Sequence, residues 1–240
     1  MIFAAGLGTR LGAIGRSTPK ALIEIAGQTM LERTARRLVA AGADRIIVNV
    51  HHQADRIVSF IAAHDLGAEI LVSREPERPL ETGGGLVHAR ALFRRDAPIV
   101  LHNVDVITDA DLRAVVAAHQ RSGALATVIV SERETSRYLL FDEAGLVGRE
   151  DRRRGLRLEG RPPRGQVRTL AFAGIHVCSP ELLDLISERG AFPILDAYLR
   201  LAAEGHTIAP WVMEGGLWLE IGDAERLGAA RALLERAASA

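Results

Sequence analysis

The first apolar segment of the chain leads directly into two glycines. Residues 1–5 read Met-Ile-Phe-Ala-Ala, which is typical of a short buried strand, and Gly6 and Gly8 follow it. Two glycines this close allow a sharp turn and let backbone N–H groups approach an anion. Arg10 and Lys20 add two cations close by in the sequence. The pattern predicts a phosphate-binding turn, although a plain strand-to-helix turn would use the same glycines.

Alternating strand and helix patterns follow this turn. Thr29 and Glu32 form a capping-box pattern at the start of a predicted helix. Apolar runs at 45–50 and 69–73 predict two further strands, with a helix at 53–63 between them. This order predicts a Rossmann-like α/β fold, with a mixed, mostly parallel sheet and helices on both faces. Ligands of such sheets bind at the carboxyl ends of the strands, where the glycine turn lies.

Three consecutive glycines follow a charged, proline-containing loop at 74–79. Residues 80–85 read Leu-Glu-Thr-Gly-Gly-Gly and lead into a predicted helix that runs through Ala91. Because glycines here cost conformational entropy, we interpret Gly83 and its neighbours as a bare backbone on which a base or a ribose lies. The alternative is an ordinary helix N-terminus that is capped by Thr82.

A candidate metal ligand follows the next predicted strand, at 98–102. The polar sequence Asn103-Val-Asp105 comes directly after this strand. An aspartate just past the carboxyl end of a central strand is well placed to hold Mg²⁺ and would meet phosphates from the glycine turn. Asp105 as a simple turn cap is the alternative. We assign Asn103 to nucleotide binding and predict that Asp109 caps the following helix.

The second half of the chain changes from alternation to consecutive strands. Segments 137–142 and 146–147 predict a hairpin, and therefore a small antiparallel excursion from the sheet. Residues 152–165 hold six arginines, two prolines and three glycines, which favours a solvated, mobile loop over a flap that closes on phosphates. Gly174, in the middle of a predicted strand at 169–178, indicates close approach of a ligand or of backbone.

Composition limits the class of protein. The 240 residues are 48% hydrophobic, and we expect a single domain over residues 1–240. Lys plus Arg equals Asp plus Glu at 30 each, which argues against general nucleic-acid binding. No apolar run approaches the roughly 20 residues that span a bilayer, and the early glycine turn leaves no room for a signal peptide. The lone Cys178 forms no internal disulfide, so we expect a cytoplasmic protein.

Two strings near the start carry a family resemblance. Residues 4–11, Ala-Ala-Gly-Leu-Gly-Thr-Arg-Leu, together with Pro-Lys-Ala-Leu at 19–22, resemble the signature of the sugar nucleotidyltransferases. Members of this family join a nucleoside triphosphate to a sugar 1-phosphate and release pyrophosphate. The resemblance covers nearly the whole chain and implies Mg²⁺ as cofactor, with Asp105 as a ligand. It also implies that Arg10 and Lys20 are catalytic and that the first string binds the nucleotide through Ala4, Ala5, Gly6, Leu7, Gly8 and Thr9.

A second string refines the expected substrates. Glu-Thr-Gly-Gly-Gly at 81–85 resembles the nucleoside-binding segment of the uridylyltransferases that act on N-acetylmuramate 1-phosphate. This resemblance implies that Glu81 and Thr82 lie beside the base. By the wider family resemblance, Gly174 lies in a strand that lines the sugar pocket. UTP with N-acetylmuramate 1-phosphate is therefore the first expectation. A mannose-1-phosphate guanylyltransferase and a cytidylyltransferase are the alternatives.

The last motif departs from the family pattern. Residues 216–223, Gly-Leu-Trp-Leu-Glu-Ile-Gly-Asp, resemble the family's Trp-x-Asp-x-Gly-Thr segment, whose aspartate is a second magnesium ligand. Here Glu220 occupies that position, and we rank it above Asp223, which is predicted to cap the last helix. The substitution also supports an alternative of another class, a regulatory protein that binds nucleotide sugars without turnover. A plain α/β domain with incidental glycines is the least favoured interpretation.

Overall fold

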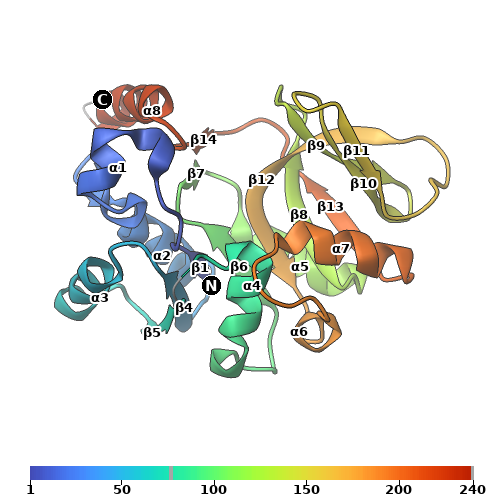
Figure 1. The fold of residues 1–240 in the computed structure, drawn as a ribbon, viewed down its shortest axis with the longest axis horizontal. Coiled ribbons are helices and arrows are strands. Elements are labelled where there is room, and N and C mark those ends of the chain that lie inside the picture. Colours follow the sequence, from blue (N-terminus) through green and yellow to red (C-terminus); the bar gives the residue numbers. More distant parts are fainter. Residues whose placement is uncertain (76–77, 239–240) are drawn as a thin grey trace.

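The fold is built on a ten-stranded mixed sheet (Figure 1). The computed structural model describes residues 1–75 and 78–238, so residues 76 and 77 of the predicted loop at 74–79 lie outside the described residues. Four strands form a parallel group in the order β6-β1-β4-β5. Their bounds are β1 (Ile2–Phe3), β4 (Arg45–Val50), β5 (Glu69–Arg74) and β6 (Ile99–Asn103).

The remaining strands add the antiparallel excursion that the sequence predicts. Strand β12 (Arg168–Cys178) pairs antiparallel with β6, with β8 (Ala126–Ser131) and with β9 (Arg137–Asp142). Strand β8 pairs in parallel with β13 (Ile208–Val212). The excursion continues from β9 to β10 (Gly145–Asp151) and β11 (Leu156–Glu159). The predicted Rossmann-like fold with a small antiparallel part is confirmed.

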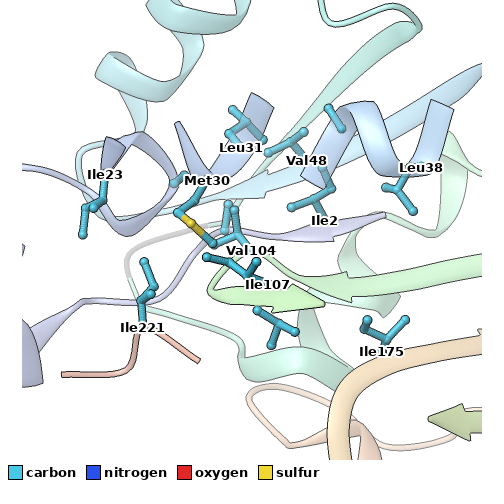
Figure 2. Packing of buried hydrophobic residues seen from close by; sticks show 14 of the residues in the cluster. Ile2, Ile23, Met30, Leu31, Leu38, Val48, Val104, Ile107, Ile175 and Ile221 are labelled. Atoms are coloured by element: carbon cyan, nitrogen blue, oxygen red, sulfur yellow. The ribbon is translucent and has the colours of Figure 1, made fainter. Parts of the chain in front are cut away.

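Helices cover both faces of the sheet, and each face has its own buried cluster. One cluster includes residues of α2 (Met30–Ala40), α3 (Ala54–Ala63), α5 (Leu112–Ser122) and α8 (Ala224–Ala238). The other includes residues of α4 (Glu81–His88), α6 (Leu182–Leu185) and α7 (Ile194–Ala203). Consecutive strand residues alternate between them, so Ile2 belongs to the first and Phe3 to the second. Figure 2 shows part of the first cluster, in which Ile2 and Val48 come from strands and Met30, Leu31 and Leu38 come from α2.

No helix in the described part of the chain has the length and apolar character needed to cross a membrane.

Short elements complete the fold. Strand β7 (Val106–Thr108) pairs antiparallel with β14 (Trp218–Glu220), and β2 (Glu24–Ile25) pairs with β3 (Gln28–Thr29). The sequence patterns did not predict β7 or β14. Their pairing joins the segments that carry the two candidate metal ligands, Asp105 and Glu220. At this junction the Ile221 N–H donates to the Asp105 carbonyl at 2.9 Å. The other short helices are α1 (Ala13–Ser17) and the 3₁₀ helices Thr9–Leu11, Lys20–Leu22 and Arg90–Leu92.

Two predicted helix caps are confirmed. The Thr29 hydroxyl accepts the Glu32 N–H at 3.2 Å at the start of α2. The Asp223 carboxylate accepts the Arg226 N–H at 2.9 Å at the start of α8. Both contacts satisfy backbone donors that the first turn of a helix leaves unpaired.

The predicted cap of α5 is wrong by two residues. Asp111, not Asp109, precedes this helix, and its carboxylate accepts the N–H groups of Arg113 and Ala114. The Asp109 carboxylate instead accepts the Leu217 N–H at 2.8 Å. Asp109 therefore fastens the segment that leads into β14, a long-range contact that helix periodicity does not reveal.

The arginine-rich segment 152–165 is not wholly a loop. Residues 156–159 form β11, which pairs antiparallel with β10, and all four of its side chains are exposed. The sequence Leu-Arg-Leu-Glu in this strand alternates with a period of two, so the strand had a signal that the surrounding prolines and glycines obscured. The expectation of solvent exposure holds for β11, and the expectation of a structureless loop does not.

Candidate functional site

The candidate site lies at the carboxyl edge of the parallel strands. Phe3 of β1 pairs with Asn49 of β4 on one side and with Asn103 of β6 on the other. Because these strands are parallel and in register, the segments that follow them emerge at one edge of the sheet. The glycine turn follows β1, and Asp105 follows β6. The sequence prediction that both lie at this edge agrees with the topology.

The protein's own geometry requires Gly8 in the glycine turn and Gly15 in the helix α1 that packs against it. Gly8 has φ +65°, a left-handed conformation that other residues rarely adopt, and its carbonyl accepts the Leu11 N–H at 3.0 Å. A Cβ on Gly15 would lie 2.1 Å from the Gly8 carbonyl oxygen, so α1 packs directly against the turn. Gly6 differs, because a Cβ there would meet nothing within 4 Å. Backbone conformation therefore explains Gly8, packing explains Gly15, and neither explains Gly6.

The other residues of the first string take distinct positions. Ala4 and Ala5 are buried at the end of β1, and Leu7 is 45% exposed. Thr9 begins the first 3₁₀ helix. The Ala4 N–H donates to the Asn49 side-chain oxygen at 2.8 Å, so this backbone donor is already used within the protein.

Asn49 belongs to a buried polar chain that sequence reasoning missed. Its side-chain amide donates to Glu75 at 2.6 Å, and the Leu80 N–H donates to the other oxygen of Glu75 at 2.8 Å. Asn49 is 1% exposed and Glu75 is 4% exposed. The end of β1 is thereby connected to the start of α4. The signal in the sequence is a single polar residue within the apolar run at 46–50.

Lys20 and Asp105 lie in direct contact. The Lys20 ammonium is 2.6 Å from the Asp105 carboxylate, and the two side chains are 12% and 18% exposed. The stem of Lys20 passes by the glycine turn, because a Cβ on Gly8 would lie 3.7 Å from its Cγ. An ammonium carries three donor hydrogens, so Lys20 can keep Asp105 and also hold a phosphate oxygen. The structure thus brings together a cation and a carboxylate that are far apart in the sequence.

Glu220 is held by two arginines. Arg226 lies 2.6 Å from one carboxylate oxygen, and Arg10 lies 3.5 Å from the other. A Cβ on Gly222 would lie 2.7 Å from the Glu220 carboxylate, so this glycine leaves room for the side chain. Sequence reasoning missed Arg226, although its place in the first turn after the predicted cap Asp223 was a usable signal.

The donor set at Asp105 and Glu220 fits a hard divalent cation. Both residues provide carboxylate oxygens from backbone segments that are hydrogen-bonded through Ile221. Among the residues that the structure describes, no group of three or more His, Cys, Asp or Glu side chains could hold a metal. Mg²⁺ does not need such a group, since it commonly binds one or two carboxylates together with substrate phosphates and water. The residues present therefore fit Mg²⁺ better than they fit a cation that needs a closed protein cage.

The glycines at 83–85 have a reason other than the predicted one. All three are buried within α4 rather than forming an open backbone surface. An added Cβ would meet the Phe192 ring at Gly83 (2.2 Å), the Gly190 carbonyl at Gly84 (2.2 Å) and the Glu75 carboxylate at Gly85 (2.6 Å). Protein packing thus gives a reason for each glycine, and contact of this segment with a base or ribose stays a prediction.

Thr82 and Gly83 also make protein contacts. The Thr82 hydroxyl accepts the Ile194 N–H at 3.0 Å, at the first residue of α7, so Thr82 caps a different helix from its own. The Gly83 N–H donates to the Phe192 carbonyl at 2.9 Å. Glu81 is exposed and has φ +59°, an unusual conformation for a residue with a side chain. Of these three candidates for nucleotide binding, Glu81 is exposed, Thr82 is half-buried and Gly83 is buried.

Replacing Gly84 with alanine tests the packing explanation. We expect the variant to lose about 1–3 kcal/mol of unfolding free energy without any nucleotide, because the new methyl group would overlap the Gly190 carbonyl. Urea unfolding measures the loss. Gly228→Ala is the matched control, since Gly228 is also helical and its added Cβ would meet nothing within 4 Å. That change should stabilise the chain slightly. Equal stability of Gly84→Ala and the unaltered chain would contradict the packing explanation.

Gly174 lies at an irregularity of β12. Its φ is +80°, and the pairing register of β12 with β8 shifts between Phe172 and His176. A Cβ on Gly174 would lie 3.0 Å from the side-chain nitrogen of Asn103. The close approach predicted at Gly174 is thus made by a neighbouring side chain. The structure brings Gly174 and Asn103 together, two residues that were predicted separately.

Comparison with known proteins places the chain in a family. The sequence pattern of the family described as Nucleotidyl transferase matches residues 1–237. An N-acetylmuramate alpha-1-phosphate uridylyltransferase of Caulobacter vibrioides is 34% identical, over 99% of this chain and 97% of the relative. The mannose-1-phosphate guanylyltransferase catalytic subunit beta of Drosophila melanogaster is 30% identical over 92% of this chain, which spans 58% of that protein.

Solved structures share the fold. A UDP-glucose pyrophosphorylase of Acinetobacter baumannii superposes with a TM-score of 0.77, covering 96% of this chain and 90% of that chain at 18% identity. HddC of Yersinia pseudotuberculosis superposes with a TM-score of 0.74, covering 97% of both chains at 20% identity. The family match over residues 1–237 agrees with the two signature strings, the sheet topology and the Lys20–Asp105 contact at the strand ends. The chain therefore belongs to the nucleotidyl transferase family, among its sugar-1-phosphate nucleotidyltransferases.

Proposed function

We propose that the chain transfers a uridylyl group from UTP to N-acetylmuramate 1-phosphate, giving UDP-N-acetylmuramate and pyrophosphate. The observation that carries this proposal is the end-to-end similarity to the Caulobacter vibrioides uridylyltransferase, at 34% identity over 99% of this chain. The identity to this relative, 34%, exceeds the 30% identity to the Drosophila melanogaster guanylyltransferase subunit, which favours the uridylyltransferase substrates.

The proposed reaction is a direct displacement. A phosphate oxygen of the sugar 1-phosphate attacks the α-phosphorus of UTP in line with the leaving group. One P–O bond forms, the bond to the β-phosphate oxygen breaks, and its electron pair leaves with pyrophosphate. Such chemistry needs no covalent enzyme intermediate and depends on positioning and on neutralising charge.

The glycine turn and its cations take the phosphate roles. Backbone N–H groups after Gly6, together with Arg10, hold the leaving β- and γ-phosphates. The open space at Gly6 supports this role, since the protein itself gives no reason for a glycine there. Lys20 offsets negative charge at the α-phosphate and at the attacking phosphate, and its closeness to Gly8 supports that position.

Members of this family generally use a divalent metal, and Asp105 and Glu220 would hold Mg²⁺ here. The bound cation would neutralise charge between the nucleotide and the incoming phosphate. The nucleoside lies along the first string and the start of α4 in this proposal, and the sugar lies near Gly174. The residues proposed to contact the nucleotide are Ala5, Gly6, Leu7, Gly8, Thr9, Glu81 and Asn103.

A regulatory, non-catalytic protein is the second candidate. The observation that favours it is the double ion pair of Glu220 with Arg10 and Arg226, which competes with a metal for the same carboxylate. Guanylyl transfer to mannose 1-phosphate is an alternative within the enzyme class, because relatives with that name are 30% identical to this chain.

Pyrophosphate release separates these candidates. The assay crosses UTP, CTP, GTP, ATP and dTTP with the 1-phosphates of N-acetylmuramate, N-acetylglucosamine, glucose and mannose, with Mg²⁺ and with a chelator. The proposal expects release with UTP and N-acetylmuramate 1-phosphate that the chelator abolishes. Release with GTP and mannose 1-phosphate alone would contradict it. Tight UTP binding without release in any combination would favour the regulatory protein.

A further inference from the structure

A cavity of about 550 Å³ is lined by residues of β8, β12 and β14, and β14 also carries the proposed metal ligand Glu220. Its walls come from the end of β8, the residues just after it, and residues 212–216. Trp218 lines it and is two positions before Glu220. The polar residues of the wall are Ser131, Glu132, Arg133, Arg168 and Glu214.

Arg133 is held in a fixed position in this wall. Its guanidinium carbon lies 3.6 Å from the centroid of the Trp218 ring, and its Nη2 donates to the Phe172 carbonyl at 2.6 Å. The Trp218 indole N–H in turn donates to the Ala173 carbonyl at 2.9 Å. Phe172 and Ala173 directly precede Gly174, where the sugar is proposed to lie. The guanidinium is thus oriented by β12 and β14 next to the acceptor side of the site.

The charge of Arg133 stacks on the Trp218 ring and has no carboxylate paired with it in the described part of the chain. No carboxylate among the described residues lies within 4.0 Å of it, and its Nε is buried without a hydrogen-bond acceptor. Burial lowers the pKa of Arg133, and the Glu220 carboxylate partly opposes this. Arg168 in the same cavity differs, because it lies 3.1 Å from Glu132.

A second polar group in the same wall is also unpaired. The hydroxyl of Ser131 is buried and has no hydrogen-bond partner in the described structure. A guanidinium whose Nε has no acceptor, together with an unpaired hydroxyl in the same cavity wall, is complementary to a planar anion such as a carboxylate. Glu132 does not supply that anion, since its carboxylate is paired with Arg168, and Glu214 is exposed.

We propose that Arg133 binds a carboxylate on the acceptor sugar and thereby selects acidic sugar 1-phosphates over neutral ones. This inference rests on the proposed function and deepens it, since it assigns the substituent that sets the acceptor. N-acetylmuramate carries a lactyl carboxylate, and N-acetylglucosamine is otherwise the same sugar without it. A site built around a partly buried charge disfavours a substrate that leaves the charge unpaired.

The test compares these two sugar 1-phosphates, which share the phosphate and differ in the carboxylate. Steady-state kinetics with UTP, and calorimetric binding of each sugar 1-phosphate, are measured for the unaltered chain and for Arg133→Gln and Arg133→Lys. We expect Arg133→Gln to raise the KM and Kd of N-acetylmuramate 1-phosphate on the order of 10- to 100-fold and to leave those of N-acetylglucosamine 1-phosphate unchanged. Arg133→Lys keeps the cation and should recover part of the loss.

Arg95→Gln is the matched control for removing a positive charge, because Arg95 is exposed and paired with Asp184 at 2.8 Å. This variant should leave the KM and Kd of both sugar 1-phosphates unchanged. An equal loss of affinity for both sugar 1-phosphates in Arg133→Gln would overturn the proposal. It would indicate that Arg133 binds the shared phosphate or has a purely structural role. No loss for either sugar would also overturn it. Absence of pyrophosphate release by the unaltered chain would contradict the proposed function, and calorimetric binding would still decide the role of Arg133.

Discussion

Replacing Lys20 with alanine is expected to lower the turnover number on the order of 10²–10³-fold. The Lys20 side chain is 12% exposed, and its ammonium lies 2.6 Å from Asp105, at the edge of the sheet that carries the glycine turn. Charge on the phosphates grows and spreads as the bond to pyrophosphate breaks, so a cation held in this place acts mostly in the transition state. The KM for each substrate should therefore change much less than the turnover number.

Initial rates of pyrophosphate release measure this effect. Lys20→Arg is the informative second variant, because it keeps the charge but replaces a compact ammonium with a planar group on a different stem. Partial activity in Lys20→Arg would agree with a role set by charge and position. Removing Lys20 also leaves Asp105 without its ion pair, so urea unfolding of both variants is needed to show that the fold is intact. Near-normal turnover of a folded Lys20→Ala variant would exclude the proposed role.

Sequence alone could place Lys20 and Asp105 at one edge of the sheet. Apolar runs and helical periods predict the order of strands and helices. Because parallel strands end at a common edge, residues that follow those strands are then expected at that edge. The direct contact between the two side chains could not be predicted, because they are separated by 85 positions and the first of them lies in a 3₁₀ turn. The topology therefore predicts that Lys20 and Asp105 lie near each other, and only the packing of the folded chain decides that they form an ion pair.

The glycines of α4 show why one string of residues can mislead. A glycine permits close approach by anything, and sequence does not say whether the approaching group is a ligand or the protein. Here the groups are Phe192 and the Gly190 carbonyl, which lie over a hundred positions further along the chain. The strands β7 and β14 were missed for a related reason. At three residues each they are too short to show a period, although their pairing joins the segments of Asp105 and Glu220.

Replacing Asp142 with asparagine is expected to cost about 3 kcal/mol of unfolding free energy. The Asp142 side chain has no exposed surface, and Arg161 binds both of its oxygens, one of them at 2.8 Å. The N–H groups of Ala144 and Arg164 also donate to the carboxylate, at 2.9 and 2.5 Å. These contacts fasten the arginine-rich segment 152–165 to the turn between β9 and β10. Without the carboxylate, the buried Arg161 guanidinium loses its counter-ion.

Urea unfolding near pH 7 measures the loss, with Asp184→Asn as the matched control. Asp184 also pairs with an arginine, Arg95, but its side chain is 65% exposed. Exposed ion pairs contribute at most about 1 kcal/mol, so the control should change stability little. Equal losses in the two variants would contradict the distinction between a buried and an exposed pair.

The pH dependence gives an independent check on Asp142. Hydrogen bonds from Arg161 hold its pKa well below the ordinary 3.8, so its contribution is complete above that pH and is lost as the pH falls through the lower value. Burial lowers the pKa of His102 to about 4 and that of His176 to about 3 from 6.5. The unaltered chain and Asp142→Asn should therefore lose the same amount of stability as the pH falls below 6.5. The reason is that these two histidines bind protons more readily in the unfolded chain than in the folded one. The difference between Asp142→Asn and the unaltered chain should stay constant down to about pH 4 and shrink below it. A difference that already narrowed between about pH 6.5 and pH 5 would show that the substitution acts through the buried histidines rather than through the ion pair with Arg161.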